Sequence, residues 1–396
     1  MLIQPFSVAR LPRIEFGSGT FHRLPSLLAG FGKHVLIVTG GRSLRATPHW
    51  AWLTATLKEQ GFSWKEIAVS SEPSPQMVDQ AVQELRGDGI EAVLGIGGGS
   101  VLDAAKAVAG LLRPGNSVLD HLEGVGPELP YRGPATPYIA VPTTAGTGSE
   151  ATKNAVLSVG GKEGFKKSFR DEQLVPQYAV VDPDLLATCP PGLIAANGMD
   201  AFTQLLESYV SSRANPFTDA LAESGLAAVR DGLLPWHRGG PASAPARERM
   251  AYAALLSGVT LAQVGLGSVH GLASPLGALF PIPHGVVCGT LVAAATRQNI
   301  AAMENREPDN PALAKYARAG RLLAEREDMA RDRAPSDLVE ILSRWTEQLQ
   351  LPRLARYGVT ASDLPAIVAN CRGSSMKTNP IVLSDAEVTE VLAQRL

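Results

Sequence analysis

Four short apolar runs in the first half of the chain constrain its fold most. Each is rich in Val, Ile, Leu and Ala and lacks the polar alternation of a half-exposed strand. The runs are Val35–Thr39, Ala92–Ile96, Tyr138–Val141 and Tyr178–Val181. Strands of this kind are buried on both faces, as in parallel sheets covered by helices. Helical periodicity follows over Val78–Arg86 and Val101–Leu112, so the pattern predicts an α/β domain with a parallel sheet.

The second half of the chain has a different character, because no convincing strand follows about Pro190. Its Ala- and Leu-rich segments have helical periodicity instead. These segments are Leu193–Ser211, Phe217–Leu234, Glu248–Gln263, Gly285–Ile300 and Ala312–Glu325. The chain has 396 residues, and single cores stop growing at roughly 250–300 residues. We therefore expect an α/β domain over residues 1–189 and an all-α domain over residues 190–396.

Composition excludes several classes of protein. The formal net charge is −2, so no overall field favours nucleic acid or an anionic membrane, and we expect neither partner. No stretch approaches the roughly 20 apolar residues of a membrane span, and Met1–Arg10 lacks the pattern of a signal peptide. The three cysteines, Cys189, Cys288 and Cys371, form neither a disulfide framework nor a CxxC metal pair. A cytoplasmic enzyme is expected.

A glycine-rich turn follows the second apolar run. The segment Gly97–Lys106 begins Gly-Gly-Gly-Ser and continues into a helix. Glycines at such a turn let the backbone approach a phosphate, and the helix offers N–H groups and a positive dipole end to the anion. Ser100 can cap the helix and donate to a phosphate oxygen. The alternative is an ordinary strand-to-helix turn with a serine cap, and the spacing is not that of the Rossmann fingerprint.

A second polar loop follows the third apolar run. The segment Pro142–Glu150 carries four hydroxyl side chains and two glycines. Its hydroxyl groups suit hydrogen bonds to a pyrophosphate, a ribose or a carboxamide, although a Ser/Thr/Gly loop without a ligand remains the alternative.

Asp200, His270 and His284 form a third set. A carboxylate near a helix start commonly serves the helix dipole, and a single histidine is more often packed or solvated than a ligand. Together, one carboxylate and two imidazoles suit a borderline divalent cation such as iron or zinc.

These segments, in this order, resemble the iron-containing alcohol dehydrogenase family along the whole chain. The resemblance runs through Ile14–Gly19, Gly97–Lys106, Thr143–Thr152, Asn197–Ser211, His270–Gly285 and Asn379-Pro380. It implies an N-terminal nucleotide-binding α/β domain, a C-terminal helical domain and a catalytic cleft between them. It also implies an NAD(P)-dependent alcohol dehydrogenase or aldehyde reductase that assembles as a homodimer or larger homo-oligomer.

The resemblance also assigns roles to individual residues. It puts Gly97, Gly98 and Ser100 at the cofactor pyrophosphate, and Asp103 belongs to the same cofactor-binding motif. Residues expected to line the nucleotide are Thr143, Thr144, Thr147 and Ser149. Lys166 aligns with a family lysine near the nicotinamide ribose, and Lys167 is one residue off in that alignment. The family's metal ligands fall at Asp200, Gln204, His270 and His284.

The chain departs from the family pattern at two of these positions. Gln204 stands where the typical family sequence has histidine, and its amide oxygen is a poorer ligand than imidazole for iron or zinc. We therefore expect any metal to be held weakly, and the family's metal-independent reductases leave open whether a metal is bound at all. Ser274 stands four residues after His270, where many family members carry a further histidine near the substrate.

The predicted reaction is reversible hydride transfer between the nicotinamide and the carbinol carbon of a small alcohol. Without a metal, His270 and His284 would supply electrostatic stabilisation or proton transfer. Ser274 would either relay a proton or serve only as a small packing residue. Two other functions stay open: a metal-independent reductase of an oxo-acid, like the family's maleylacetate reductases, and a non-catalytic nucleotide-binding protein.

The turn after Val35–Thr39 bears on cofactor choice. NAD-preferring family members often carry an acid there, which binds the adenosine ribose and repels a 2′-phosphate. This chain has Gly40, Gly41, Arg42 and Ser43, and a guanidinium binds phosphate bidentately. The turn therefore predicts that NADP is accepted and favoured over NAD, unless Arg42 is an ordinary solvated side chain.

Overall fold

The computed structural model describes residues 4–161, 164–326, 328 and 333–396, and the chain forms two compact units. The described residues of the first unit in the chain lie within Ala9–Val159 and Lys166–Cys189. Those of the other unit lie within Met1–Val8, Gly160–Phe165 and Pro190–Leu396.

The first unit is built on a six-stranded sheet whose neighbouring strands all pair in parallel, which confirms the predicted fold class. Its strands are β1 (Arg13–Phe16), β2 (His34–Gly40), β3 (Ser63–Val69), β4 (Ala92–Gly97), β5 (Tyr138–Pro142) and β8 (Tyr178–Val181). The order across the sheet is β1-β8-β5-β4-β2-β3. The four predicted strands are the four inner ones, and the two strands at the edges, β1 and β3, were not predicted.

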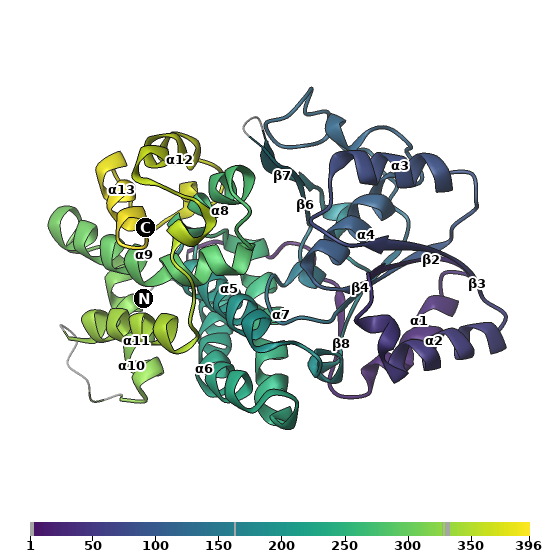
Figure 1. Cartoon of the computed structure of the whole chain (residues 1–396), viewed down its shortest axis with the longest axis horizontal. Coiled ribbons are helices and arrows are strands. Elements are labelled where there is room, and N and C mark those ends of the chain that lie inside the picture. Colours follow the sequence, from purple (N-terminus) through teal and green to yellow (C-terminus); the bar gives the residue numbers. More distant parts are fainter. Residues whose placement is uncertain (1–3, 162–163, 327, 329–332) are drawn as a thin grey trace. The chain divides into compact units, whose positions relative to one another are not determined.

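Helices cover the sheet of this unit (Figure 1). They are α1 (Leu24–Ala29), α2 (Pro48–Glu59), α3 (Pro75–Leu85) and α4 (Gly99–Leu111). A separate two-stranded sheet pairs β6 (Asn154–Val159) with β7 (Phe165–Arg170). The buried helix α4 packs closely on β4, because a Cβ atom at Gly95 would lie 2.8 Å from the Ala105 side chain. The glycine in the strand therefore sets how near α4 approaches the sheet.

The strand order creates a switch point beside β2. This strand pairs with β3 on one side and with β4 on the other, and the chain leaves β2 towards β3 but leaves β4 in the opposite direction, towards β5. In open α/β sheets, ligands bind at the carboxyl ends of the strands at such a point. The register pairs Thr39 with Ile96 and Gly97 with Pro142. The three polar turns predicted from the sequence therefore follow adjacent strands at one edge of the sheet.

The second unit contains helices, and the described residues after Pro190 include no strand. Its α-helices are α5 (Pro191–Val210), α6 (Pro216–Gly239), α7 (Ala244–Val264), α8 (Ser268–Leu279), α9 (His284–Arg306), α10 (Pro311–Ala324), α11 (Ala334–Gln348), α12 (Leu364–Asn370) and α13 (Asp385–Ala393). The five predicted helical segments correspond to α5, α6, α7, α9 and α10. Helix α5 is buried along most of its length and packs against α6, α7 and α9, so it forms the centre of this unit (Figure 1).

Among the described residues, no single helix is long and apolar enough to cross a membrane. Helices α7 and α8 meet that test by length and composition only as a pair, and the pair is bent by 100°.

Candidate functional site

The turn after β4 leads directly into helix α4. Gly98, with φ −75° and ψ −179°, is the N-cap residue, and no side chain caps the helix. The prediction that Ser100 caps α4 is therefore wrong, because the helix begins at Gly99 and Ser100 lies within its first turn. The backbone of Gly98 thus lies at the positive end of the helix dipole with no side chain of its own in the way. This arrangement fits a pyrophosphate.

The polar loop Pro142–Glu150, the threonine loop, packs against this turn. The Thr143 N–H donates to the Gly97 carbonyl oxygen at 2.9 Å. A Cβ atom at Gly99 would lie 2.8 Å from the Thr147 side chain, whereas one at Gly98 would lie 3.4 Å from Thr144 Oγ1. The structure therefore brings the two predicted cofactor loops together, with Gly99 tightly packed against the threonine loop and Gly98 much less constrained.

Asp103 and Ser149 belong to a buried polar network beneath these loops. The Ser149 hydroxyl donates to Asp103 Oδ1 at 2.5 Å, and the Val156 N–H donates to Asp103 Oδ2 at 3.2 Å. Lys106 Nζ donates to the carbonyl oxygen of Ser149 at 2.8 Å and to its hydroxyl oxygen at 3.0 Å. The network ties α4 to the threonine loop and to β6. Cofactor contact by Asp103 and Ser149 stays a prediction.

Burial shifts the protonation equilibria of this network. Loss of solvent raises the pKa of Asp103 and lowers that of Lys106 to about 8. Loss of solvent also raises the pKa of the buried Glu150 to about 7, with Lys106 opposing the shift. The sequence argument missed Lys106 and Glu150, because a lysine in a helix and an acid in a loop carry no signal of burial.

Glu150→Gln is expected to stabilise the protein above pH 7. The pKa of Glu150 rises on folding from 4.5 to about 7, so its contribution to stability is full below pH 4.5 and is lost as the pH rises through 7. A shift of this size corresponds to about 3 kcal/mol. Unfolding by urea across this pH range measures it, with the exposed Glu59→Gln as the control. Equal pH slopes for wild type and Glu150→Gln would contradict the prediction.

Lys166 lies on β7, where its ammonium group pairs with the carboxylate of Glu72. Lys166 is also close enough to Asp103 to lower the pKa of that carboxyl, although burial has the larger, opposite effect. Successive side chains of a strand point to opposite faces. Lys167 therefore points away from Asp103, which favours Lys166 as the residue that faces the cofactor loops.

The turn after β2 contains two arginines in different environments. Arg42 is exposed and makes no side-chain hydrogen bond or ion pair within the described part of the chain. Arg45 pairs with Glu66 at 2.6 Å and lies over the ring of Trp50 at 4.9 Å. Arg45 is thus already bound within the fold. Arg42, next to Gly40, Gly41 and Ser43, has its guanidinium available for a phosphate.

The helical unit brings together Asp200 of α5, His270 of α8 and His284 of α9. Asp200 Oδ1 lies 3.3 Å from His270 Nε2 and 3.6 Å from His284 Nε2. Gly285 allows the first turn of α9 to reach α5, because a Cβ atom there would lie 2.4 Å from the Ala196 carbonyl oxygen. Asp200 lies in the middle of α5 rather than near its start, so the helix-dipole interpretation of this acid is wrong.

Cys288 is the fourth member of the cluster. Its Sγ lies 3.6 Å from His270 Nε2 and 3.8 Å from His284 Nε2. Ligand atoms of Asp200, His270, His284 and Cys288 all lie within 4.8 Å of one another. The sequence argument missed Cys288 because it treated the cysteines only as disulfide or CxxC candidates. The available signal was its position one helical turn after His284.

Gln204 lies one turn after Asp200, but its amide is engaged within the protein. Nε2 of Gln204 donates to Asp200 Oδ1 at 3.4 Å, and its Oε1 accepts a hydrogen bond from the Ser257 hydroxyl at 2.8 Å. Only the NH₂ end of an amide can donate to a carboxylate. Gln204 therefore presents a donor, not a ligand atom, to Asp200.

Glu207, one further turn along α5, orients His270. Its Oε2 accepts from His270 Nδ1 at 2.6 Å, and its Oε1 accepts from the Val269 N–H at 2.7 Å. Because a carboxylate can only accept, Nδ1 carries the proton, and Nε2 is directed towards Asp200 and Cys288. This pairing is the usual support for a metal-binding imidazole.

Charge in this cluster favours a cation. Burial alone would raise the pKa of Asp200, but His284 and His270 outweigh it and the pKa lies below its usual value. Burial alone would lower the pKa of His270, but Cys288, Glu207 and Asp200 raise it well above its usual value. Burial raises the pKa of the Cys288 thiol to about 12. The negative potential that raises the pKa of His270 also suits a divalent cation, and carboxylate, imidazole and thiol groups are ligands for such an ion.

Ser274 lies on α8, one helical turn after His270, and its side chain is only partly buried. Its role as a proton relay stays a prediction.

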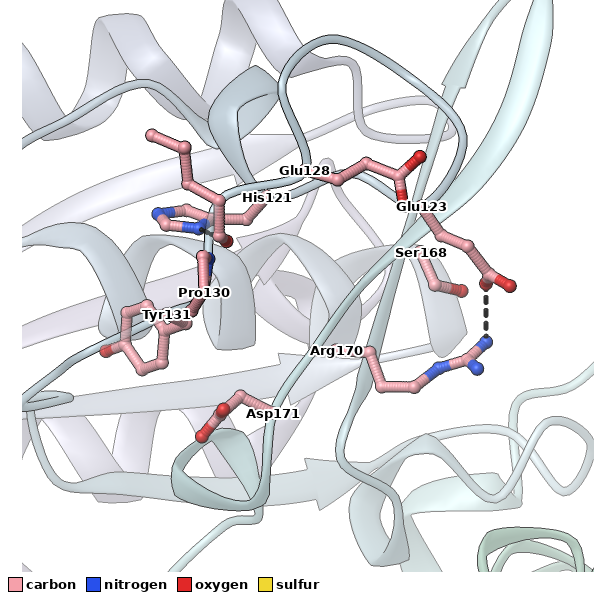
Figure 2. A pocket seen from close by; sticks show the side chains of 9 residues that line it. His121, Glu123, Glu128, Pro130, Tyr131, Ser168, Arg170 and Asp171 are labelled. Carbon is pink, nitrogen blue, oxygen red and sulfur yellow. Dashed lines mark hydrogen bonds and ion pairs between the residues drawn. The ribbon is translucent and has the colours of Figure 1, made fainter.

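A cavity of about 320 Å³ occupies another part of the α/β unit. Figure 2 shows its lining, in which Arg170 and Glu123 form an ion pair at 3.1 Å. His121 stacks on Phe169 near this lining, and its Nδ1 lies 2.8 Å from the Leu129 carbonyl oxygen. None of the residues predicted from the sequence to bind cofactor or metal lines this cavity.

Comparison with known proteins identifies the family. The model of iron-containing alcohol dehydrogenases matches residues 12–183, and the model of the C-terminal part of the Fe-containing alcohol dehydrogenase family matches residues 194–396. An NAD-dependent methanol dehydrogenase from Bacillus methanolicus is 28% identical over 97% of this chain and 98% of that protein. An NADPH-dependent butanol dehydrogenase from Clostridium saccharobutylicum is 29% identical over 96% of each chain.

A solved structure agrees with these matches. A 1,3-propanediol oxidoreductase superposes with a TM-score of 0.89 at 26% identity, over 99% of this chain and 100% of that one. This protein therefore belongs to the iron-containing alcohol dehydrogenase family, and it transfers hydride between a nicotinamide cofactor and a small alcohol or aldehyde.

Proposed function

We propose that this alcohol dehydrogenase favours NADP(H) and holds a divalent cation, iron or zinc, at Asp200, His270 and His284. One observation carries the metal proposal: three ionisable donors from α5, α8 and α9 converge in one cluster, in which Asp200 and His270 are buried and His284 is partly exposed. The exposed guanidinium of Arg42 after β2, where no acid lies, supports the cofactor proposal. The family resemblance supports a homodimer or larger homo-oligomer, and the three free cysteines are consistent with a cytoplasmic location.

When bound, the nicotinamide would exchange a hydride with the carbinol carbon, and a divalent cation would supply Lewis acidity towards its oxygen. The chain's own residues would bind the cofactor and orient the side chains around the reacting carbon. The Gly98 backbone and the N-terminus of α4 would hold the pyrophosphate, and Thr143, Thr144 and Thr147 of the adjoining loop would contribute hydroxyl groups. Glu207 holds the proton on His270 Nδ1 and so keeps Nε2 directed into the cluster.

Wild type is expected to have a higher kcat/KM for NADPH than for NADH. Arg42→Ala should lower kcat/KM for NADPH about tenfold, because a hydrogen bond to a charged group contributes about 1.5–3 kcal/mol and Arg42 is exposed. The value for NADH should hardly change. The relatives leave the preference open, since the methanol dehydrogenase is NAD-dependent and the butanol dehydrogenase is NADPH-dependent.

Arg45→Ala is the matched control, because Arg45 already pairs with Glu66. Arg45→Ala should change the ratio of kcat/KM for NADPH to kcat/KM for NADH less than Arg42→Ala does. A strong NADH preference that Arg42→Ala leaves unchanged would rule out the proposed cofactor choice.

A further inference from the structure

The described residues include a thiol, that of Cys288, close to the three expected metal ligands. This chain lacks the histidine that the family typically has at position 204. Gln204 stands at that position, but its amide oxygen accepts from Ser257 and its NH₂ group faces Asp200. Turning the amide over would set its oxygen against the carboxylate, an acceptor against an acceptor. In this orientation the amide donates to Asp200 and its oxygen is held by Ser257, which favours a positioning role for Gln204.

Cys288 is placed where a fourth ligand belongs. It follows His284 by one turn on α9, so both side chains lie on the same face of that helix. Its Sγ lies 3.6 Å from His270 Nε2 and 3.8 Å from His284 Nε2, while Asp200 Oδ1 lies 3.3 Å and 3.6 Å from the same two nitrogens. Four ligands at the usual zinc bond lengths and tetrahedral angles are separated by about 3.4–3.6 Å.

We propose that Cys288, not Gln204, supplies the fourth protein ligand to the divalent cation, and that Gln204 is a positioning residue for Asp200. This rests on the proposed cation at Asp200, His270 and His284. As the ion binds, the thiol releases its proton to solvent and the sulfur forms the bond to the ion as a thiolate. A thiolate is a strong ligand for a borderline metal, so the cation is held tightly, in contrast to the weak site expected from Gln204 alone.

The test uses cobalt(II) as the probe, added alone to full-length protein that has been dialysed against a chelator. Wild type should bind one cobalt ion and develop a thiolate-to-cobalt charge-transfer band in the near ultraviolet. Cys288→Ser should lose the band. Cys371→Ser removes another buried thiol of the same unit and should retain it. Thermal melting checks that each variant folds, and Cys288→Ala provides a second variant that must lose the band as well.

The affinity for cobalt distinguishes the ligand from the positioning residue. In competition with a chelator, Gln204→Ala should weaken cobalt binding about 10–100-fold, as expected for a group that orients a ligand, and should keep the charge-transfer band. Cys288→Ser should weaken binding more than Gln204→Ala does. The reverse order would show that Gln204 is the ligand and would overturn the proposal.

Two further outcomes would also overturn it: cobalt bound by wild type without a charge-transfer band, or no cobalt bound at all. Alcohol oxidation with NADP⁺, measured on the same preparations, keeps the proposed function separate. If a cation binds without the band, the site at Asp200, His270 and His284 is supported and only the role of Cys288 as a ligand is wrong. If the enzyme is active without any bound cation, the proposed metal site is wrong, but the protein is still a dehydrogenase.

Discussion

Gly98→Ala is expected to lower the affinity for NADPH about 100-fold, the loss that a displacement of roughly 1 Å can cause in a preorganised site. The physical reason is that the Gly98 backbone caps α4 without a side chain, so an added methyl group would stand between the helix N-terminus and the pyrophosphate. Stability should hardly change. The new Cβ would lie 3.4 Å from its nearest neighbour, Thr144 Oγ1, and φ of −75° suits any residue.

Fluorescence titration with NADPH and thermal melting measure the two quantities separately. The melting temperature of Gly98→Ala should stay within about 3 °C of wild type, since 1 kcal/mol shifts a domain of this size by roughly 2–4 °C. Gly99→Ala is the matched control for packing, because its Cβ would lie 2.8 Å from Thr147. Overpacking of this kind costs about 1–3 kcal/mol. Equal losses of affinity and stability in Gly98→Ala would mean that the glycine serves only the fold.

The sheet was predictable where strands are buried on both faces. Strands β2, β4, β5 and β8 are continuous in apolar residues because helices cover both of their faces. The edge strands β1 and β3 are largely exposed, so their sequences lack such runs. Edge strands are stabilised by pairing with one neighbour, and this pairing leaves no periodic signal in the sequence.

Helix α8 was missed for a related reason. It carries Gly271 and Pro275 inside its length, and both residues lower the helix propensity of a short segment. Tertiary packing makes the helix. A Cβ atom at Gly271 would lie 2.9 Å from the Met376 side chain, so the glycine that weakens the helix signal is needed for close contact with the chain near α12.

The metal cluster shows what spacing can and cannot reveal. Asp200, Gln204 and Glu207 recur at the i, i+4 and i+7 positions of one helix face, and this pattern was available in the sequence. Which atom of Gln204 faces Asp200 was not available, because it depends on Ser257 of another helix. The position of Cys288 one turn after His284 was visible in the sequence, but its approach to His270 of α8 appears only in the fold.

His270→Ala is expected to lower kcat/KM for alcohol oxidation by about 10²–10⁴-fold, the range for removing a positioned catalytic group. Glu207→Gln should lower it about 10–100-fold, the usual effect of removing the partner of a metal-binding imidazole. The amide can still accept from the Val269 N–H, but its NH₂ group would then face His270 Nδ1. This favours the tautomer with the proton on Nε2, so the lone pair no longer points at Asp200 and Cys288.

Steady-state kinetics and a zinc titration measure these effects together. For Glu207→Gln, metal affinity and turnover should fall while the melting temperature changes little, because the side-chain volume is retained. Glu223→Gln is the matched control: Glu223 accepts from the Tyr209 hydroxyl at 2.6 Å and lies outside the cluster. Its zinc affinity and turnover should equal those of wild type. If Glu207→Gln behaves like this control, the orientation of His270 does not depend on the carboxylate, and the role assigned to Glu207 is wrong.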